Sequence, residues 1–141
     1  MNKQLREAII QNEQLDIVLL SETHLQGNKC INVHGFTSFC SNRKEIHVKA
    51  PKGSGGVALL IKNEILSDFN VRVIDKEVEG ILGVKLLHTE SDFSFVVYSC
   101  YLAPENSVWG RKSDMYFQHL TSQLYMNEDA DFILLGGDFN A

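Results

Sequence analysis

The chain has 141 residues, of which 44% are apolar and 22% charged, and its formal net charge is −5. This length suits one domain with a buried core, and the apolar fraction excludes disordered and collagen-like classes. The longest apolar run, residues 57–61, is far short of the roughly 18–20 residues of a membrane-spanning helix. The first residues lack the apolar stretch of a secretory signal. We therefore expect an intracellular protein, with the nucleus a plausible location, that has no membrane partner and is not secreted.

The distribution of charge and the number of cysteines indicate which partners the protein binds and in which cellular compartment it lies. Residues 41–62 contain five Lys or Arg residues against one acidic residue, on a chain that is acidic as a whole. A basic segment of this kind suits the approach of a phosphate backbone, and a solvated loop explains it equally well. Three cysteines, Cys30, Cys40 and Cys100, are an odd number without zinc-like spacing. They predict free thiols in an intracellular protein.

The first half of the chain predicts one helix and three strands. Leu5, Ala8 and Ile9 recur at helical spacing and predict a short amphipathic helix over residues 2–13. The apolar run within residues 16–22 predicts a strand covered on both faces, and residues 36–40 predict a short strand. Residues 41–56, rich in glycine, predict a long mobile loop, and residues 56–62 predict a buried strand.

The second half predicts a hairpin, a helix and a last strand. Residues 80–88 and 93–101 are strand-like runs joined by a short polar link, which indicates an antiparallel hairpin. A helix capped by Ser113 should bury a stripe of Phe117, Leu120 and Leu124. Residues 131–135 predict a second buried strand. Helices at each end with strands between them indicate an α/β or α+β fold with mixed strand directions.

Two of the predicted buried strands lead directly into carboxylates. Glu22 follows the first, and Asp138 follows the last after two glycines, with Asn140 two residues further on. If both strands run the same way in one sheet, the two carboxylates meet at one edge. Such a pair could hold Mg²⁺ and orient or deprotonate a water molecule. Taken singly, Glu22 or Asp138 is explained equally well as a polar residue that ends its strand in water.

Four motifs in order give a more specific signal. They are Ser-Glu-Thr-His-Leu at 21–25, Gly-Gly-Val-Ala-Leu-Leu-Ile at 55–61, Ser-Cys-Tyr-Leu-Ala-Pro at 99–104 and Gly-Asp-Phe-Asn at 137–140. Together they resemble the endonuclease/exonuclease/phosphatase superfamily. The first motif is most similar to the endonuclease domain of LINE-type (non-LTR) retrotransposons.

The resemblance implies an α/β (α+β) fold, a partial four-layer α/β/β/α sandwich of the deoxyribonuclease-like type. It implies a phosphodiester hydrolase in which Glu22 binds Mg²⁺ or Mn²⁺ and Asp138 positions or deprotonates water, or protonates the leaving oxygen. Asn140 would contact the scissile phosphate and Asp138, and Tyr101 would donate its hydroxyl to a phosphate oxygen. His24 would touch the nucleic-acid backbone.

Some of these residues have ordinary explanations that remain open. Tyr101 also completes the apolar face of its strand, and His24 also suits a solvated loop. Trp109, with Arg111 and Lys112, could supply a stacking and phosphate contact, or the tryptophan could pack under the loop. The expected partners are DNA and the remainder of a retrotransposon polyprotein with reverse transcriptase.

The sequence departs from the superfamily pattern in two places. The asparagine-bearing strand that precedes the first helix is missing, and there is no Ser-Asp-His motif. We therefore expect residues 1–141 to form a single, incomplete domain, truncated at both ends, whose DNA endonuclease activity is impaired. The alternatives are a non-catalytic remnant that at most binds nucleic acid, and a relative that hydrolyses small phosphoesters.

Overall fold

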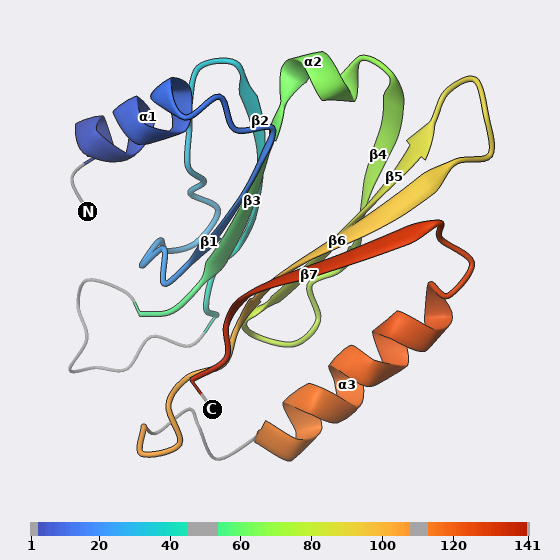
Figure 1. Cartoon of the computed structure of the whole chain (residues 1–141). Coiled ribbons are helices and arrows are strands. Elements are labelled where there is room, and N and C mark those ends of the chain that lie inside the picture. Colours follow the sequence, from blue (N-terminus) through green and yellow to red (C-terminus); the bar gives the residue numbers. More distant parts are fainter. Residues whose placement is uncertain (1–2, 45–53, 108–112, 141) are drawn as a thin grey trace.

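Two β-sheets pack face to face in the computed structural model, which describes residues 3–44, 54–107 and 113–140 (Figure 1). The first half of the chain forms α1 (Lys3–Asn12), β1 (Ile17–Ser21), β2 (Phe36–Ser41), β3 (Val57–Lys62) and α2 (Asn63–Leu66). The second half forms β4 (Phe69–Asp75), β5 (Ile81–His88), β6 (Ser94–Tyr101), α3 (Ser113–Met126) and β7 (Phe132–Asp138). Among these helices, none is long and apolar enough to cross a membrane.

The two sheets differ in strand direction. The first has the order β1-β3-β2 with both pairs antiparallel, so the wholly apolar run of β3 lies in its centre. The second has the order β4-β5-β6-β7, in which β5 and β6 form the expected antiparallel hairpin and β7 runs parallel to β6. A parallel return needs a crossover, and α3 provides it. The expectation of mixed strand directions is confirmed.

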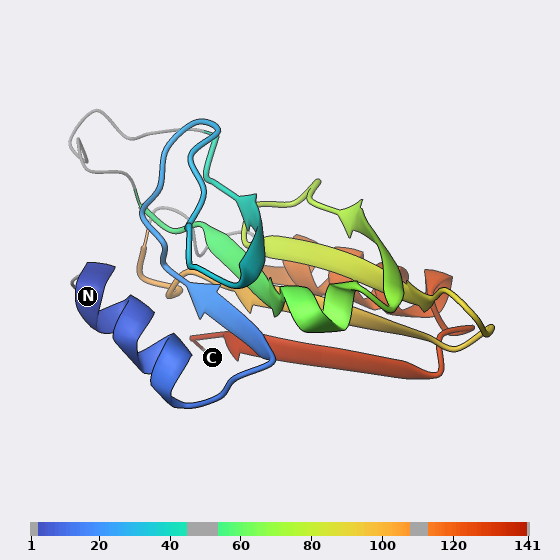
Figure 2. The ribbon, with the colours of Figure 1, turned by 90° about the horizontal axis from the view of Figure 1, so that it is seen from above.

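Three apolar clusters show that the fold has four layers. Between the sheets, residues of β3 such as Leu59 pack against residues of β5 and β6 such as Val84 and Val97. Ile10 of α1 lies in the cluster on the outer side of the first sheet, and Leu120 of α3 lies in the cluster on the outer side of the second. Figure 1 shows α1 and α3 on opposite outer sides of the two sheets, and in the view from above α3 lies behind the strands of the second sheet (Figure 2). The α/β/β/α arrangement expected from the sequence is therefore present.

The last strand is not buried as its sequence indicates. Along β7, Phe132 is 67% exposed and Leu134 is 49% exposed. The reason is topological, because β7 lies at the edge of the four-stranded sheet and no described element pairs with its outer side. The apolar run of β7 is thus an uncovered surface rather than part of the core.

Several local predictions also need correction. The elements α2 and β4 were not expected, because polar residues such as Asn70 and Arg72 interrupt the apolar pattern of β4. Helix α3 begins at Ser113 and buries Leu120, but Phe117 is 42% exposed and Tyr116 takes its place in the core. Leu124 is partly buried against the same cluster, so the predicted stripe is right at Leu120 and Leu124 and wrong at Phe117.

The prediction of three free thiols is wrong for two of them. Cys30 and Cys40 form a disulfide that links the β1–β2 connection to β2, with their Cα atoms 5.7 Å apart. Only the folding of that connection brings the two residues within bonding range, so their spacing in the sequence does not reveal the pair. Cys100 is a buried free thiol in β6, as expected.

Candidate active site

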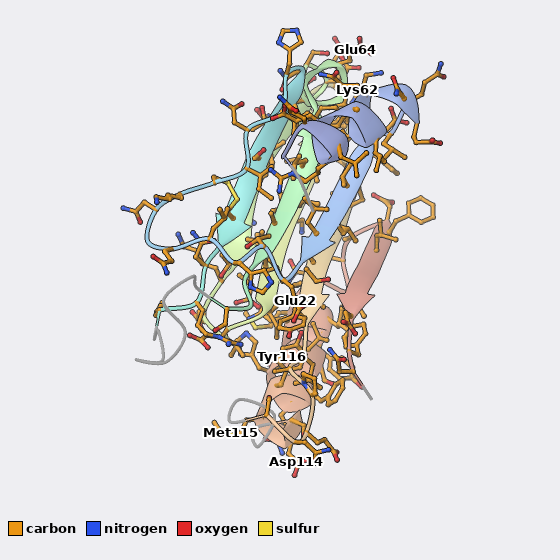
Figure 3. All side chains as sticks on the ribbon, turned by 90° about the vertical axis from the view of Figure 1, so that its left-hand side faces the viewer. Glu22, Lys62, Glu64, Asp114, Met115 and Tyr116 are labelled. Atoms are coloured by element: carbon orange, nitrogen blue, oxygen red, sulfur yellow. A yellow bond between two sulfur atoms is a disulfide. The ribbon has the colours of Figure 1, made fainter. Side chains whose placement is uncertain are left out.

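The chemistry-bearing residues converge at one end of the two sheets. In the second sheet, the parallel register of β6 and β7 places Tyr101 beside Asp138. In the first sheet, Glu22 directly follows β1 and lies at this same end (Figure 3). The similar sequences of β1 and β7 suggested that the two strands share one sheet. They lie instead in different sheets. Their ends nevertheless meet, because the two sheets pack face to face and β1 contacts both β6 and β7.

A direct hydrogen bond joins the two sheets at this end. The hydroxyl of Tyr101 donates to Oε1 of Glu22 over 2.5 Å. Tyr101 is only 7% exposed, whereas Glu22 is exposed to solvent. The Glu22 backbone has a φ of 51°, which turns the chain out of β1 and presents the carboxylate to the tyrosine.

The turn that carries Glu22 is held by the glycines before β3. The backbone N–H of Thr23 donates to the carbonyl of Gly56 over 3.2 Å, and that of His24 donates to the carbonyl of Gly55 over 2.9 Å. Gly56 has a φ of 86°, and a Cβ at this position would press on the Thr23 side chain. The Gly-Gly pair is therefore required by the backbone geometry around Glu22.

The electrostatic surroundings keep Tyr101 protonated at neutral pH. Burial raises the pKa of Tyr101 to about 12, and the hydrogen bond to Glu22 together with the negative charges of Glu22 and Asp138 adds to this effect. The positive charge of Arg43 acts in the opposite direction. Tyr101 is thus a hydrogen-bond donor next to two carboxylates.

Asp138 and Asn140 form a local hydrogen-bonded unit. The backbone N–H of Asn140 donates to Oδ1 of Asp138 over 3.1 Å, and its side-chain amide donates to the carbonyl of Leu102 over 3.0 Å. The N–H of Leu102 in turn donates to the carbonyl of Asp138 over 2.8 Å. This exchange fixes the end of β7 against the end of β6.

Gly137 is the residue that allows this close approach. Its φ is 150°, and an added Cβ would overlap the backbone carbonyl of Cys100 on β6. A side chain at this position would push β7 away from β6. The Gly-Gly pair before Asp138 is therefore explained by strand packing as much as by room for a substrate.

The donor set suits a hard divalent cation. Among the described residues, no group of three or more His, Cys, Asp and Glu residues is arranged to hold a metal. Mg²⁺, however, is commonly bound by one or two carboxylates, with water and substrate phosphate completing its shell. Glu22 supplies an oxygen ligand of this kind, because Tyr101 engages only one of its two carboxylate oxygens, so it fits Mg²⁺ or Mn²⁺.

The structure also shows residues near the site to which the sequence pattern gave no role. Arg43 is 91% buried by its side chain and forms an ion pair with Glu79, its Nε lying 3.2 Å from Oε2. His119 of α3 contacts the buried Asp75. Arg43 belongs to the basic segment noted in the sequence, whereas nothing in the sequence indicated the His119 pair, which joins α3 to the end of β4.

The structure gives the positions of some of the other residues singled out in the sequence, but not of all of them. His24 is exposed at the same end as Glu22, and its backbone rather than its ring makes the bond described above. Lys62 of the basic segment pairs with Glu64 at the opposite end of the sheet (Figure 3). Trp109, Arg111 and Lys112, with most of the predicted 41–56 loop, lie outside the described residues.

The fold and the site define a two-sheet α+β protein with an acidic, tyrosine-bearing edge. Over residues 4–141 the sequence matches the Endonuclease/Exonuclease/phosphatase family, and the chain belongs to that family. Members of this family are hydrolases that act on phosphoester bonds and generally use divalent metal ions. Comparison with curated protein sequences gives no match.

Solved structures share the fold at low sequence identity. An AP endonuclease from Leishmania major superposes with a TM-score of 0.76 at 15% identity, over 96% of this chain and 49% of that one. The catalytic domain of human Nocturnin, with a bound sulfate, gives a TM-score of 0.61 at 16% identity, over 99% and 56% of the two chains. A conserved protein of unknown function from Enterococcus faecalis gives 0.55 at 16% identity, over 99% and 58%. The chain thus spans about half the length of these structures.

Proposed function

We propose that this chain contributes to a Mg²⁺-dependent DNA endonuclease of the type found in non-LTR retrotransposons. The observation that carries the proposal is the convergence of Glu22, Tyr101 and Asp138 at one end of the two sheets, through a hydrogen bond and a strand register. Family membership supports phosphoester hydrolysis. The Ser-Glu-Thr-His-Leu form of residues 21–25 supports the retrotransposon type, and with it a reverse transcriptase as a neighbour in the same polyprotein.

The roles of the residues follow from what each can donate or accept. Glu22 has one carboxylate oxygen engaged by Tyr101, which leaves the other to bind the cation. Asp138 is exposed and can orient an attacking water molecule or take its proton. Tyr101, kept protonated, can turn its hydroxyl toward a phosphate oxygen of the substrate. When bound, the divalent cation would neutralise charge on the phosphate and polarise the attacking water.

The hydrogen bonds already present prepare this arrangement. The Asn140 backbone N–H holds Asp138 by one oxygen, so its other oxygen can face the water. The side-chain nitrogen of Asn140 donates a hydrogen bond to the carbonyl of Leu102. This bond fixes the orientation of the amide group, including its oxygen, which is a hydrogen-bond acceptor. Orientation of this kind is the main contribution that the protein makes in metal-assisted phosphoester hydrolysis.

A plasmid-nicking assay with Mg²⁺ and with chelator tests the proposal. We expect nicking to require Mg²⁺ and to fall by about 100-fold or more in Glu22→Gln, because groups that act together in catalysis cannot be removed singly without large losses. Glu64→Gln is the matched control, because Glu64 is also an exposed carboxylate but lies at the opposite end of the sheet (Figure 3). It should nick as the unchanged chain does.

Binding of Mn²⁺, measured by electron paramagnetic resonance, adds a readout that does not depend on turnover. Glu22→Gln should weaken Mn²⁺ binding, and Glu64→Gln should leave it unchanged. Nicking that persists with chelator or in Glu22→Gln would refute the proposal. The complete absence of nicking would also refute it and favour a non-catalytic, nucleic-acid-binding chain. Hydrolysis of p-nitrophenyl phosphate without nicking would favour a small-phosphoester hydrolase.

A further inference from the structure

Arg43 is a buried cation to which the proposed chemistry gives no role. It lies just after β2, and its side chain is only 9% exposed. A charged side chain is rarely buried unless it is paired, so the contacts of its guanidinium indicate what it holds in place. These contacts reach two segments that are far apart in the sequence, the glycine turn before β3 and the loop after β4.

The first segment is the glycine turn before β3, which supports the turn at Glu22. Nη1 of Arg43 donates to the hydroxyl of Ser54 over 2.9 Å. The guanidinium also lies directly against Gly55, because a Cβ added to that glycine would be 2.8 Å from Nη2. The carbonyl of Gly55 accepts the backbone N–H of His24 over 2.9 Å. Arg43 therefore supports, through this turn, the backbone that presents the Glu22 carboxylate.

The second segment is the loop after β4, which is bonded to the backbone of Tyr101. Nε of Arg43 lies 3.2 Å from Oε2 of Glu79, and the backbone N–H of Lys44 donates to Oε1 of the same carboxylate over 3.0 Å. The carbonyl of the next residue, Gly80, accepts the backbone N–H of Tyr101 over 2.7 Å. Arg43 therefore holds the loop to which the end of β6 is attached.

Together these contacts close a ring around the candidate active site. The hydroxyl of Tyr101 donates to Glu22, and Arg43 bridges the glycine turn on the Glu22 side and the loop on the Tyr101 side. A guanidinium suits this bridge because its planar fork directs several N–H groups in fixed directions, whereas the ammonium of a lysine is a compact point charge.

We propose that Arg43 is a positioning residue, whose buried guanidinium sets where the Glu22 carboxylate lies relative to Tyr101. It acts through the glycine turn and through Glu79 rather than by touching the reacting phosphate. This proposal rests on the proposed function and adds a residue to it. The charge of Arg43 and its bridging contacts have opposite consequences for a cation at Glu22, so the two can be told apart.

Binding of Mn²⁺ alone, measured by electron paramagnetic resonance, separates the charge from the bridge. If Arg43 acted only as a positive charge, Arg43→Gln would remove a repulsion and tighten Mn²⁺ binding. If it positions Glu22, Arg43→Gln should weaken binding by about tenfold, the loss expected when a hydrogen bond to a charged group is removed. Arg43→Lys should also weaken binding, since lysine keeps the charge but not the fork. Tighter or unchanged binding in either variant would overturn the proposal.

Hydrogen exchange of backbone amides gives a readout that needs neither metal nor turnover. Arg43→Lys should raise the exchange rate of the His24 amide by about tenfold, because its acceptor at Gly55 is held less firmly. The Lys62 amide, which donates to the carbonyl of Asp16 at the opposite end of the same sheet, should exchange at an unchanged rate. An equal increase at both amides would show general destabilisation and overturn the proposal.

Lys85 supplies a matched control variant. Its ammonium lies 3.3 Å from Asp129 and its side chain is 13% exposed, so it is a cation of similar burial that also forms an ion pair. The strand register places it opposite Val96, near the start of β6 and away from the Tyr101 end. Lys85→Gln should leave Mn²⁺ binding unchanged, whereas Arg43→Gln should weaken it. Equal losses in the two variants would contradict a specific role for Arg43.

The two proposals fail separately. Faster exchange at His24 in Arg43→Lys without any nicking would support the role of Arg43 and reject the endonuclease. Mg²⁺-dependent nicking that Arg43→Lys leaves unchanged would do the reverse. In an active chain, Arg43→Lys should lower kcat and leave KM for DNA unchanged, because a positioning residue acts on the geometry of the site and not on substrate binding. A raised KM with unchanged kcat would make Arg43 a DNA-binding residue and overturn the proposal.

Discussion

The hydrogen bond between Tyr101 and Glu22 links the two sheets, and its strength can be measured with a double-mutant cycle. Tyr101→Phe removes only the donor, and Glu22→Gln removes the acceptor charge. A hydrogen bond to a charged group contributes about 1.5–3 kcal/mol when buried. Since Glu22 is exposed and water can replace the tyrosine, we expect a coupling free energy of about 1 kcal/mol.

The coupling free energy is obtained from urea unfolding of the unchanged chain, the two single variants and the double variant at pH 7. Each single variant should be destabilised, and the double variant should be less destabilised than the sum of the two. A coupling below about 0.3 kcal/mol, which is within the usual error of additivity, would refute the reasoning that the two sheets are joined here. The ultraviolet absorbance of the phenolate gives a second measure, because Glu22→Gln should bring the pKa of Tyr101 down from about 12.

Two further predictions concern burial. Burial raises the pKa of Tyr98 from 10.0 to about 12, so the folded state keeps this proton longer than the unfolded state. Its contribution is therefore complete below pH 10 and is lost as the pH rises from 10 to 12, by about 1 kcal/mol at pH 11. The fall in unfolding free energy between pH 9 and 11 should therefore be about 1 kcal/mol smaller in Tyr98→Phe, and the remainder comes from other buried groups such as Tyr101. On β7, Phe132→Lys should reduce self-association in sedimentation experiments and change the unfolding free energy by less than about 0.5 kcal/mol, because Phe132 is 67% exposed. A destabilisation of several kcal/mol would show instead that this side chain is buried.

The exposed strand β7 is a surface at which another polypeptide could pair. The structures that share its fold are about twice as long, and this chain covers 49% to 58% of each. The apolar run of β7 has the composition of a buried strand, but the described residues leave it uncovered. An uncovered edge strand of this kind promotes pairing with another polypeptide.

Local sequence pattern was sufficient for most individual elements. The apolar run of β3 predicted a buried strand, and the two runs joined by a polar link predicted the β5–β6 hairpin. Both signals depend on neighbouring residues alone, namely the alternation and length of apolar runs and the turn between them. The ordered motifs around Glu22 and Asp138 indicated the family in the same way.

Tertiary structure alone decided how these elements meet. The repeated pattern of β1 and β7 suggested one sheet, but the chain places them in two sheets whose facing sides bring Glu22 to Tyr101. The Cys30–Cys40 disulfide and the His119–Asp75 contact likewise join segments whose separation in the sequence carries no signal. Periodicity reports which residues can be buried, whereas the partner of each residue depends on long-range packing that no local window contains.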